Sequence, residues 1–293
     1  MKLRYIRLIR PLGWLPYLSP FAVGFALGIT SSSNLFHVIF SFIAFCCCGS
    51  FCFTINAITD KDTDRFHDGK SKDINLTYQP IVTGEITEKQ ALILSMIFLF
   101  FSLFFAWLIN ILFFLLTLII NAFGCMYSMP PTRLKAKPIG DILCNTIVGG
   151  IIFLAGLSIG GKNMIPLLIM VAFLSPPVYY IPTVITDYKF DKKAKLKTSA
   201  IFYGPKKILR VIYPLSALVI LIYLILFLSY NLEIKVISLQ VIISILSVVL
   251  LSNIKLKEKR MSIHKNWMFI PLALKSTVFI VYGILKLVGL III

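Results

Sequence analysis

The chain has 293 residues, 58% of which are hydrophobic, and its mean hydropathy is +0.91. This apolar share is far above that of a soluble domain, so the composition excludes an ordinary soluble globular protein. The formal net charge of +17 would suggest a nucleic-acid partner in a soluble protein, and the placement of the charges decides whether that applies here.

Long apolar runs divide the chain into about nine candidate membrane spans, since about 17 to 25 apolar residues fit one helical crossing of the hydrocarbon core. Helices are expected because lipid offers no partner for unpaired backbone groups, and the alternating pattern of a membrane barrel is absent from the sequence. The predicted fold class is therefore an all-α integral membrane bundle. In chain order, the predicted spans cover residues 13–31, 35–58, 90–109, 111–128, 139–160, 163–186, 209–229, 234–253 and 267–291.

Most of the 29 Lys and Arg residues fall on one side of this arrangement. The exceptions are Lys162 and Lys235 in opposite loops, and Lys275 and Lys286 within the last span. The positive-inside rule then places the N-terminus and the basic loops in the cytoplasm of a multi-pass cell-membrane protein. The basic surplus is attributed to topology and to contact with anionic membrane lipid, and no nucleic-acid partner is predicted.

The first acidic cluster, NAITDKDTD, directly follows the second predicted span. On a helix, a step of four residues advances about 400°, so Asn56, Asp60 and Asp64 share one face with a drift of about 40° per step. Asp62 points roughly opposite Asp60 and is interpreted as a solvated charge. The three residues on the shared face form a column of oxygen ligands at the membrane surface.

The second cluster, TVITDYKFD, repeats this spacing at the end of the sixth predicted span. Thr183, Asp187 and Asp191 lie at i, i+4 and i+8, again on one helix face. On the predicted topology, both columns emerge at the same membrane face. One such cluster alone is equally well explained as helix-end charge exposed to water, whereas two clusters of matched spacing favour a shared binding site.

Carboxylate and amide oxygens suit a hard cation such as Mg²⁺, which keeps water ligands and binds substrate phosphates. The four aspartates of the two columns supply a charge of about −4, two Mg²⁺ ions return it to neutral, and a diphosphate adds about −3 that needs further cations. Arg133 and Lys135 in YSMPPTRLKAKP, which also contains Tyr127, and Lys197 in KLKTS are candidates. Taken singly, these residues are also expected as interfacial anchors.

Other functions associated with acidic clusters fit the sequence less well. A calcium EF-hand is rejected because Arg65 and Ser71 stand at the sixth and twelfth places counted from Asp60. A cation-coupled membrane transporter, which remains an alternative, is expected to bury ionisable residues near mid-membrane, whereas both clusters lie at span ends. A lipid-linked glycosyltransferase generally works on the membrane side opposite to these acids. Asp141, at the start of the fifth span, is interpreted as a helix N-terminal cap in preference to a catalytic group.

These motifs resemble those of the UbiA superfamily of intramembrane prenyltransferases. NAITDKDTD resembles the family signature NDxxDxxxD through Asn56, Asp60 and Asp64, and the second signature, DxxxD, is matched by Asp187 and Asp191. YSMPPTRLK resembles the tyrosine, arginine and lysine segment between them, and PIVTGEIT resembles PLxSGxIS. RLIRPLGWL is similar to the family's opening and KTSAIFYG to its KTLAxxxG ending, so that the matches keep their order over residues 4–204.

The resemblance implies a single transmembrane domain over residues 1–293, with helices around a central cavity open sideways to lipid. Cytoplasmic loops at 59–89, 128–138 and 187–208 would carry the motifs. The implied activity is Mg²⁺-dependent transfer of a polyprenyl group from a polyprenyl diphosphate to a hydrophobic acceptor (an aromatic or quinone precursor, or another lipid), with release of pyrophosphate. A UbiA-type terpene cyclase that acts on the prenyl diphosphate itself is the alternative within the family.

The same resemblance implies roles for the matched residues. Two Mg²⁺ ions would be held by Asn56, Asp60, Asp64, Asp187 and Asp191. Arg133, Lys135 and Lys197 would contact the diphosphate, and Tyr127 would lie close to the bond being broken. The catalytic set is then the four aspartates with Tyr127 and Lys135.

The sequence departs from the family's pattern at three positions. Ala57 follows Asn56 where many members have Asp, and Thr183 stands where many carry Asp or Asn. Gln79 replaces the common Arg before the proline of the loop phrase, which removes a positive charge. Asn56, Thr183 and Gln79 are therefore candidate substrate-binding residues, and the acceptor end of the site is expected to be unusual.

Overall fold

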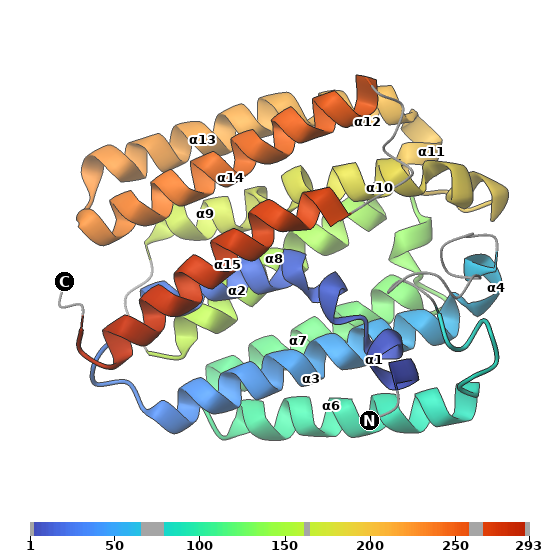
Figure 1. Cartoon of the computed structure of the whole chain (residues 1–293), viewed down its shortest axis with the longest axis horizontal. Helices are drawn as coiled ribbons and strands as arrows, with labels where there is room; N and C mark the ends of the chain where they lie inside the picture. The colour runs from blue at the N-terminus through green and yellow to red at the C-terminus, as the bar shows by residue number, and fades with distance from the viewer. Residues whose placement is uncertain (1–2, 66–78, 161–164, 258–265, 291–293) are drawn as a thin grey trace.

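The computed structural model describes residues 3–65, 79–160, 165–257 and 266–290 (Figure 1). Helices make up the framework of these ranges, which contain no β-strand, so the predicted all-α fold is confirmed. Residues 66–78 of the first predicted motif loop, and Lys162 in a predicted opposite loop, lie outside the described residues.

The helices follow the predicted spans closely. The predicted sixth span, 163–186, is broken at Ser175 because Pro176 and Pro177 have no backbone N–H to continue a helix and instead start a new one. In chain order the helices are α1 (Leu3–Ile9), η1 (Pro11–Trp14), α2 (Leu15–Gly28), α3 (Leu35–Thr59), α4 (Lys61–Asp64), α6 (Glu88–Trp107), α7 (Ile111–Ser128), η2 (Leu134–Ala136), α8 (Gly140–Ser158), α9 (Pro166–Leu174), α10 (Pro176–Lys193), α11 (Ser199–Tyr203), α12 (Pro205–Arg210), α13 (Ile212–Ser229), α14 (Leu232–Lys257) and α15 (Asn266–Leu287).

Several of these helices are long and apolar enough to cross a membrane. The predicted span 13–31 corresponds to α2, which is not among them, and the count of about nine spans is not confirmed. Helix α2 has only 14 residues because η1 precedes it and the chain turns extended at Ile29. The described ranges contain seven such stretches, which are Leu35–Thr59, Glu88–Trp107, Ile111–Ser128, Gly140–Ser158, Pro166–Lys193, Pro205–Ser229 and Glu233–Ser252.

Side-chain caps begin several of the spanning helices, including α6 and α7. At the start of α6, the Thr87 side chain accepts a hydrogen bond from the backbone N–H of Gln90, and the Gln90 side chain accepts one from the backbone of Thr87. At the start of α7, Asn110 accepts a hydrogen bond from the backbone N–H of Phe113 at 2.8 Å. These caps satisfy N–H groups that have no partner inside the helix.

Helices α2 and α8 run through the middle of the bundle, between a layer of α3, α6 and α7 and a layer of α13 and α14 (Figure 1). Helix α15 packs on α2, and α10 contacts α8, α13 and α14. This arrangement brings the C-terminal ends of α3 and α10 to the same end of the bundle (Figure 1). Because those two ends carry the acidic clusters, the fold itself brings the clusters together.

Glycines allow α2 and α8 to pack closely. A Cβ added at Gly24 would lie 2.1 Å from the carbonyl oxygen of Phe153, and one added at Gly156 would lie 2.4 Å from that of Phe21. Small residues at helix interfaces permit such approach in membranes, where association depends on packing more than on hydrophobic burial. The α2–α8 pair is therefore a scaffold that tolerates little change at these positions.

The substitution Gly24→Ala is expected to destabilise the protein by about 1–3 kcal/mol, because the new methyl group overlaps backbone that cannot move aside. The measurement is the free energy of unfolding by SDS titration in mixed micelles. Gly13→Ala is the control, since its Cβ would meet the ring of Phe53, which borders a cavity and has room to turn. Equal stability of Gly24→Ala and wild type would contradict this account of the interface.

Candidate active site

A cavity of about 1340 Å³ lies inside the bundle and is bordered by residues from α1 through α15. Its walls are largely apolar, with residues such as Phe21, Phe45, Phe123 and Ile152. Its polar end is bordered by Asn56, Asp60, Asp64, Asp187 and Asp191, so all five predicted metal ligands border one cavity. Both predicted columns therefore face the same space.

The first column persists although its helix is interrupted. Helix α3 ends at Thr59, yet the backbone N–H of Asp60 donates to Asn56 at 3.0 Å and that of Asp64 donates to Asp60 at 2.7 Å. This bonding keeps the helical spacing across the junction with α4, and it holds the three side chains on one face. The side-chain N–H of Asn56 donates to the Ser128 hydroxyl at 3.3 Å, and the side-chain oxygen of Asn56 takes no part in that bond.

Asp62 points away from this column, as predicted. Its side chain is 88% exposed and lies 3.7 Å from the guanidinium of Arg65. Asp60, by contrast, is only 8% exposed. Two aspartates two positions apart in the sequence therefore have opposite environments, one in water and one in the cavity wall.

Two cations from the loop between α7 and α8 pair with Asp60. The Arg133 guanidinium lies 3.3 Å from Oδ1 of Asp60, and the Lys135 ammonium donates a hydrogen bond to the same oxygen. Arg133 has a left-handed backbone (φ 35°), which turns the chain so that both side chains reach one carboxylate. Burial lowers the pKa of Lys135 from its ordinary value, while the adjacent carboxylate of Asp60 opposes that change.

The second column lies entirely on α10. Thr183, Asp187 and Asp191 all border the cavity, and the Thr183 hydroxyl donates to the backbone carbonyl of Tyr180 at 2.7 Å. Thr198, in the loop that follows α10, donates to Oδ2 of Asp191 at 3.2 Å. This bond folds the loop back onto the acidic end of the helix.

Two predicted substrate contacts do not border the cavity. Lys197 is exposed on the loop after α10, and Gln79 is buried away from the residues that form the cavity wall. Both side-chain polar atoms of Gln79 are buried without a hydrogen-bond partner in the described structure. Arg133 does not border the cavity either, but its ion pair with Asp60 keeps it at the site.

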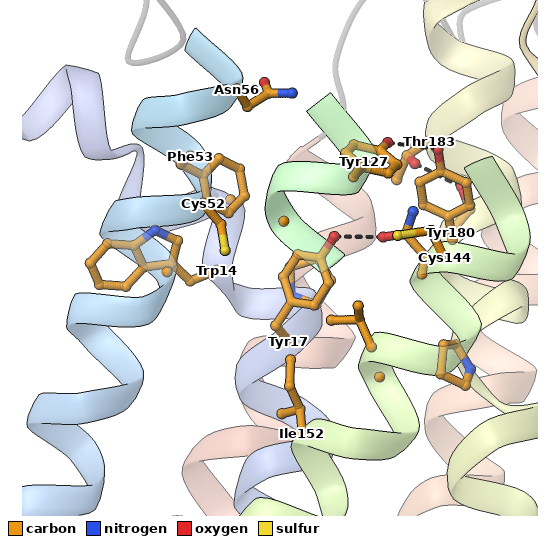
Figure 2. Close-up of a pocket in the computed structure, with 18 of the residues that line it drawn as sticks. Trp14, Tyr17, Cys52, Phe53, Asn56, Tyr127, Cys144, Ile152, Tyr180 and Thr183 are labelled. Carbon is orange, nitrogen blue, oxygen red and sulfur yellow. Dashed lines mark hydrogen bonds between the residues drawn. The ribbon is translucent and has the colours of Figure 1, made fainter. Parts of the chain in front are cut away.

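Tyrosines form a hydrogen-bonding wall on one side of the cavity (Figure 2). The hydroxyl of Tyr127 lies 3.0 Å from that of Tyr180, and the hydroxyl of Tyr17 donates to the Asn145 amide oxygen at 2.6 Å. In Figure 2, Asn56 projects from α3 across the cavity from this wall. Only Tyr127 was predicted from the sequence, because Tyr17 and Tyr180 lie within apolar spans without a motif of their own.

Two arginines of the N-terminal segment also border the cavity, although the sequence pattern indicates them only as topological charges. These are Arg7 on α1 and Arg10 before η1, whose guanidinium lies 5.8 Å from the ring centre of Phe53. The signal that could have found them is RLIRPLGWL, which was matched to the family's opening without a role for its arginines.

Asp141 is a buried brace between α8 and the segment after α10. Its carboxylate accepts hydrogen bonds from the backbone N–H groups of Ile142 and Ser199, each at 2.9 Å, and from the Ser199 hydroxyl. The N-terminal cap predicted for Asp141 is not found, because Ile139 is the N-cap of α8 and Asp141 lies in the first turn, where its carboxylate accepts from Ser199 at the start of α11. Because Thr198 precedes Ser199 and binds Asp191, the brace also supports the second acidic column.

The donor set at the polar end of the cavity fits Mg²⁺. In the part of the chain that the structure describes, no three Asp, Glu, His or Cys side chains lie close enough to hold an ion by themselves. The oxygen ligands are instead divided between the ends of α3 and α10. Mg²⁺ suits this division, since it is commonly held by one or two carboxylates and completes its octahedron with water and substrate phosphate oxygens.

The fold and site thus define a helical membrane protein with a paired-carboxylate site at one end of an apolar cavity. The sequence profile described as the UbiA prenyltransferase family matches residues 17–273. The chain therefore belongs to this family, whose members are prenyltransferases. No curated protein sequence matched the chain.

Solved structures support this membership. A UbiA homologue from Archaeoglobus fulgidus bound to DMAPP and Mg²⁺ is 41% identical, with a TM-score of 0.89 over 97% of this chain and 99% of that chain. The same homologue bound to GPP and Mg²⁺ gives 40% identity and a TM-score of 0.89 over the same shares. A UbiA homologue from Aeropyrum pernix K1, at 20% identity and a TM-score of 0.70 over 96% and 99% of the two chains, shares the fold.

The substitution Asp141→Ala is expected to lower the free energy of unfolding by about 2 kcal/mol, because it removes an acceptor shared by three donors. The released loop should also be cut faster by trypsin, which cleaves after the exposed Lys195 and Lys197. Mass spectrometry of the early fragments locates the cleavage. Wild-type cleavage rates in Asp141→Ala would show that the loop is held by other contacts.

Proposed function

We propose that this chain transfers a polyprenyl group from a polyprenyl diphosphate to a hydrophobic acceptor and releases pyrophosphate in a Mg²⁺-dependent reaction. The observation that carries the proposal is that two aspartate columns and Lys135 border the polar end of one large apolar cavity. A molecule with a charged head and a long apolar tail matches such a cavity. The likeness to UbiA homologue structures bound to prenyl diphosphates and Mg²⁺ supports this choice of substrate.

In this proposal, Mg²⁺, with two ions expected, would be held by Asn56, Asp60, Asp64, Asp187 and Asp191 together with the substrate diphosphate. Mg²⁺ supplies charge neutralisation that makes pyrophosphate a better leaving group. Asp60 is suited to a role as a metal ligand because Arg133 and Lys135 pair with its carboxylate and hold it at the site. Asp191 is oriented by its hydrogen bond from Thr198.

Lys135 and Arg133 are assigned to the leaving group. The carbon–oxygen bond between the prenyl C1 atom and the diphosphate breaks, and its electron pair leaves with the diphosphate oxygen. A cation fixed beside that oxygen stabilises the charge that develops on it, and it does so more strongly in a water-poor site. Gln79 and Lys197 are not assigned here, because neither borders the cavity.

Apolar residues of the cavity wall surround the isoprenoid tail, and the cavity shields the allylic cation from water until the acceptor captures it. The acceptor's nucleophilic atom forms a bond to C1 and loses a proton. Tyr127 is placed near the breaking bond, and its contact with Tyr180 positions its hydroxyl on the cavity wall. Because the hydroxyl of Tyr127 is neutral, it can orient the substrate by hydrogen bonding, and it offers the allylic cation no charged oxygen that would capture it.

The proposed setting is a single transmembrane domain over residues 1–293 in the cell membrane, with the acidic end of the bundle in the cytoplasm. The support for this orientation is the excess of Lys and Arg in the loops at that end. A cation-coupled transporter is no longer needed to explain the acids, because the chain belongs to an enzyme family.

Asp60→Ala and Asp187→Ala are each expected to lower the rate of pyrophosphate release by at least about 100-fold, because each removes a metal ligand. The measurement is Mg²⁺-dependent pyrophosphate release from geranylgeranyl diphosphate in detergent, with mass spectrometry of the prenyl product with and without acceptor. A product formed without acceptor would indicate a cyclase. Asp62→Ala is the matched control, since that carboxylate is exposed to water and should be dispensable. Turnover at the wild-type rate in either cavity mutant would rule out the assigned metal site.

Lys135→Ala is expected to slow the ionisation step by about 100-fold, since it removes one donor to the leaving group. Single-turnover kinetics at saturating acceptor measures that step separately from acceptor binding, which should change less. Lys137→Ala provides the control, because Lys137 lies two residues further along the loop and is exposed. If the chemical step is unchanged in Lys135→Ala, this lysine acts only as the partner of Asp60.

A further inference from the structure

Two lysines are buried within α15, a helix that packs against α2 and α14. Lys275 and Lys286 are each only 6% exposed. A charged side chain among apolar helices costs free energy unless a partner compensates it, and such residues commonly mark functional sites. The partners of the two lysines therefore indicate what each one does.

Lys286 is compensated inside the protein. Its ammonium forms an ion pair with Glu233 of α14 and donates a hydrogen bond to the backbone carbonyl of Ala26 on α2 at 2.9 Å. These contacts join three helices, and Lys286 does not border the cavity. Its role is structural.

Lys275 is different, because it borders the cavity and has no acidic partner among the described residues. Its neighbour is Tyr179 of α10, whose hydroxyl lies 3.5 Å from Nζ and whose ring centre lies 4.8 Å from Nζ. The Tyr179 hydroxyl in turn donates to Ser244 at 3.3 Å. An ammonium has three N–H donors, and this arrangement occupies one of them.

The position of Lys275 separates it from the diphosphate site. Tyr179 precedes Asp187 by eight residues on α10, which is about 12 Å along the helix axis. Tyr179, Thr183 and Asp187 all border the cavity. One continuous cavity therefore has a metal-binding end and, about two helical turns away, a single buried cation.

We propose that Lys275 and Tyr179 form a subsite for the ionised acid group of the acceptor, a carboxylate or a phosphate. This inference rests on the proposed function and names the class of acceptor that the site takes. The acceptor is an acid whose nucleophilic atom reaches the prenyl C1 atom while its anionic oxygens contact Lys275. Its acid group and its nucleophilic atom are therefore separated by no more than about 12 Å, the axial distance between Tyr179 and the aspartate end.

The selectivity follows from the environment of the lysine. An anionic oxygen beside Lys275 balances a charge that has no acidic partner among the described residues, whereas a neutral ester or amide of the same shape does not. A site built around a buried charged donor rejects the analogue that lacks the matching acceptor. Acids should therefore bind more tightly than their neutral counterparts.

The first test measures binding of 4-hydroxybenzoate, its methyl ester and phenyl phosphate to the full-length protein in detergent, by isothermal titration calorimetry without a prenyl donor. Wild type should bind one or both acids roughly 10- to 100-fold more tightly than the ester, as expected for a hydrogen bond to a charged group. Lys275→Met should abolish that preference, Lys275→Arg should keep part of it, and ester binding should be equal in all three proteins.

The acid that binds distinguishes a carboxylate-bearing from a phosphate-bearing acceptor, and either result supports the subsite. Equal affinity of wild type for the acids and the ester, or unchanged acid affinity in Lys275→Met, overturns it. Because no prenyl donor is present, the result does not depend on pyrophosphate release. Failure of the proposed function would appear in the Asp60→Ala experiment, and failure of the subsite would appear here.

A second measurement distinguishes a substrate-binding role of Lys275 from a purely structural one. Lys286→Met should lower the thermal midpoint of unfolding, because it leaves Glu233 buried beside an apolar side chain. Lys275→Met should not lower it, because the variant removes a buried charge that has no acidic partner in the described structure. A loss of stability in Lys275→Met equal to that in Lys286→Met would overturn the proposal.

Discussion

The carboxylate of Asp60 is the interaction on which the rest of the site depends. A carboxylate this deeply buried is costly unless cations compensate it, and here Lys135 and Arg133 do so together. Their pairing holds the loop between α7 and α8 against the end of α3. That loop leads into α8, where Asp141 binds Ser199, so one set of contacts supports both acidic columns.

The parts of this site that rest on local periodicity could be predicted from the sequence. The four-residue spacing of Asn56, Asp60 and Asp64 placed them on one face, and the face is kept although α3 ends at Thr59, because the backbone hydrogen bonds continue across the junction. The second column needed only one helix, α10, which extends beyond the predicted end of its span to Lys193. Composition alone was enough for the all-α membrane fold.

Contacts between distant segments could not be predicted in the same way. Tyr17 and Asn145 are 128 residues apart, and only the close packing of α2 on α8 brings them together. Gln79 is a different case, since its place in a motif predicts a substrate contact that the cavity geometry does not support. In the structure its backbone oxygen accepts hydrogen bonds from Val82 and Thr83, which shapes the turn before α6, and its side chain does not border the cavity.

The two lysines of α15 show why a buried charge has to be judged from its partners. They are eleven residues apart, close to three helical turns, so they project from nearly the same face about 16 Å apart along the axis. Lys286 ties that face to α2 and α14 through Ala26 and Glu233. Once that face is fixed against the bundle, Lys275 has to point inward as well, toward Tyr179 and the cavity. The ion pair that holds the helix therefore also positions the second lysine, and it does so without supplying that lysine with a counterion.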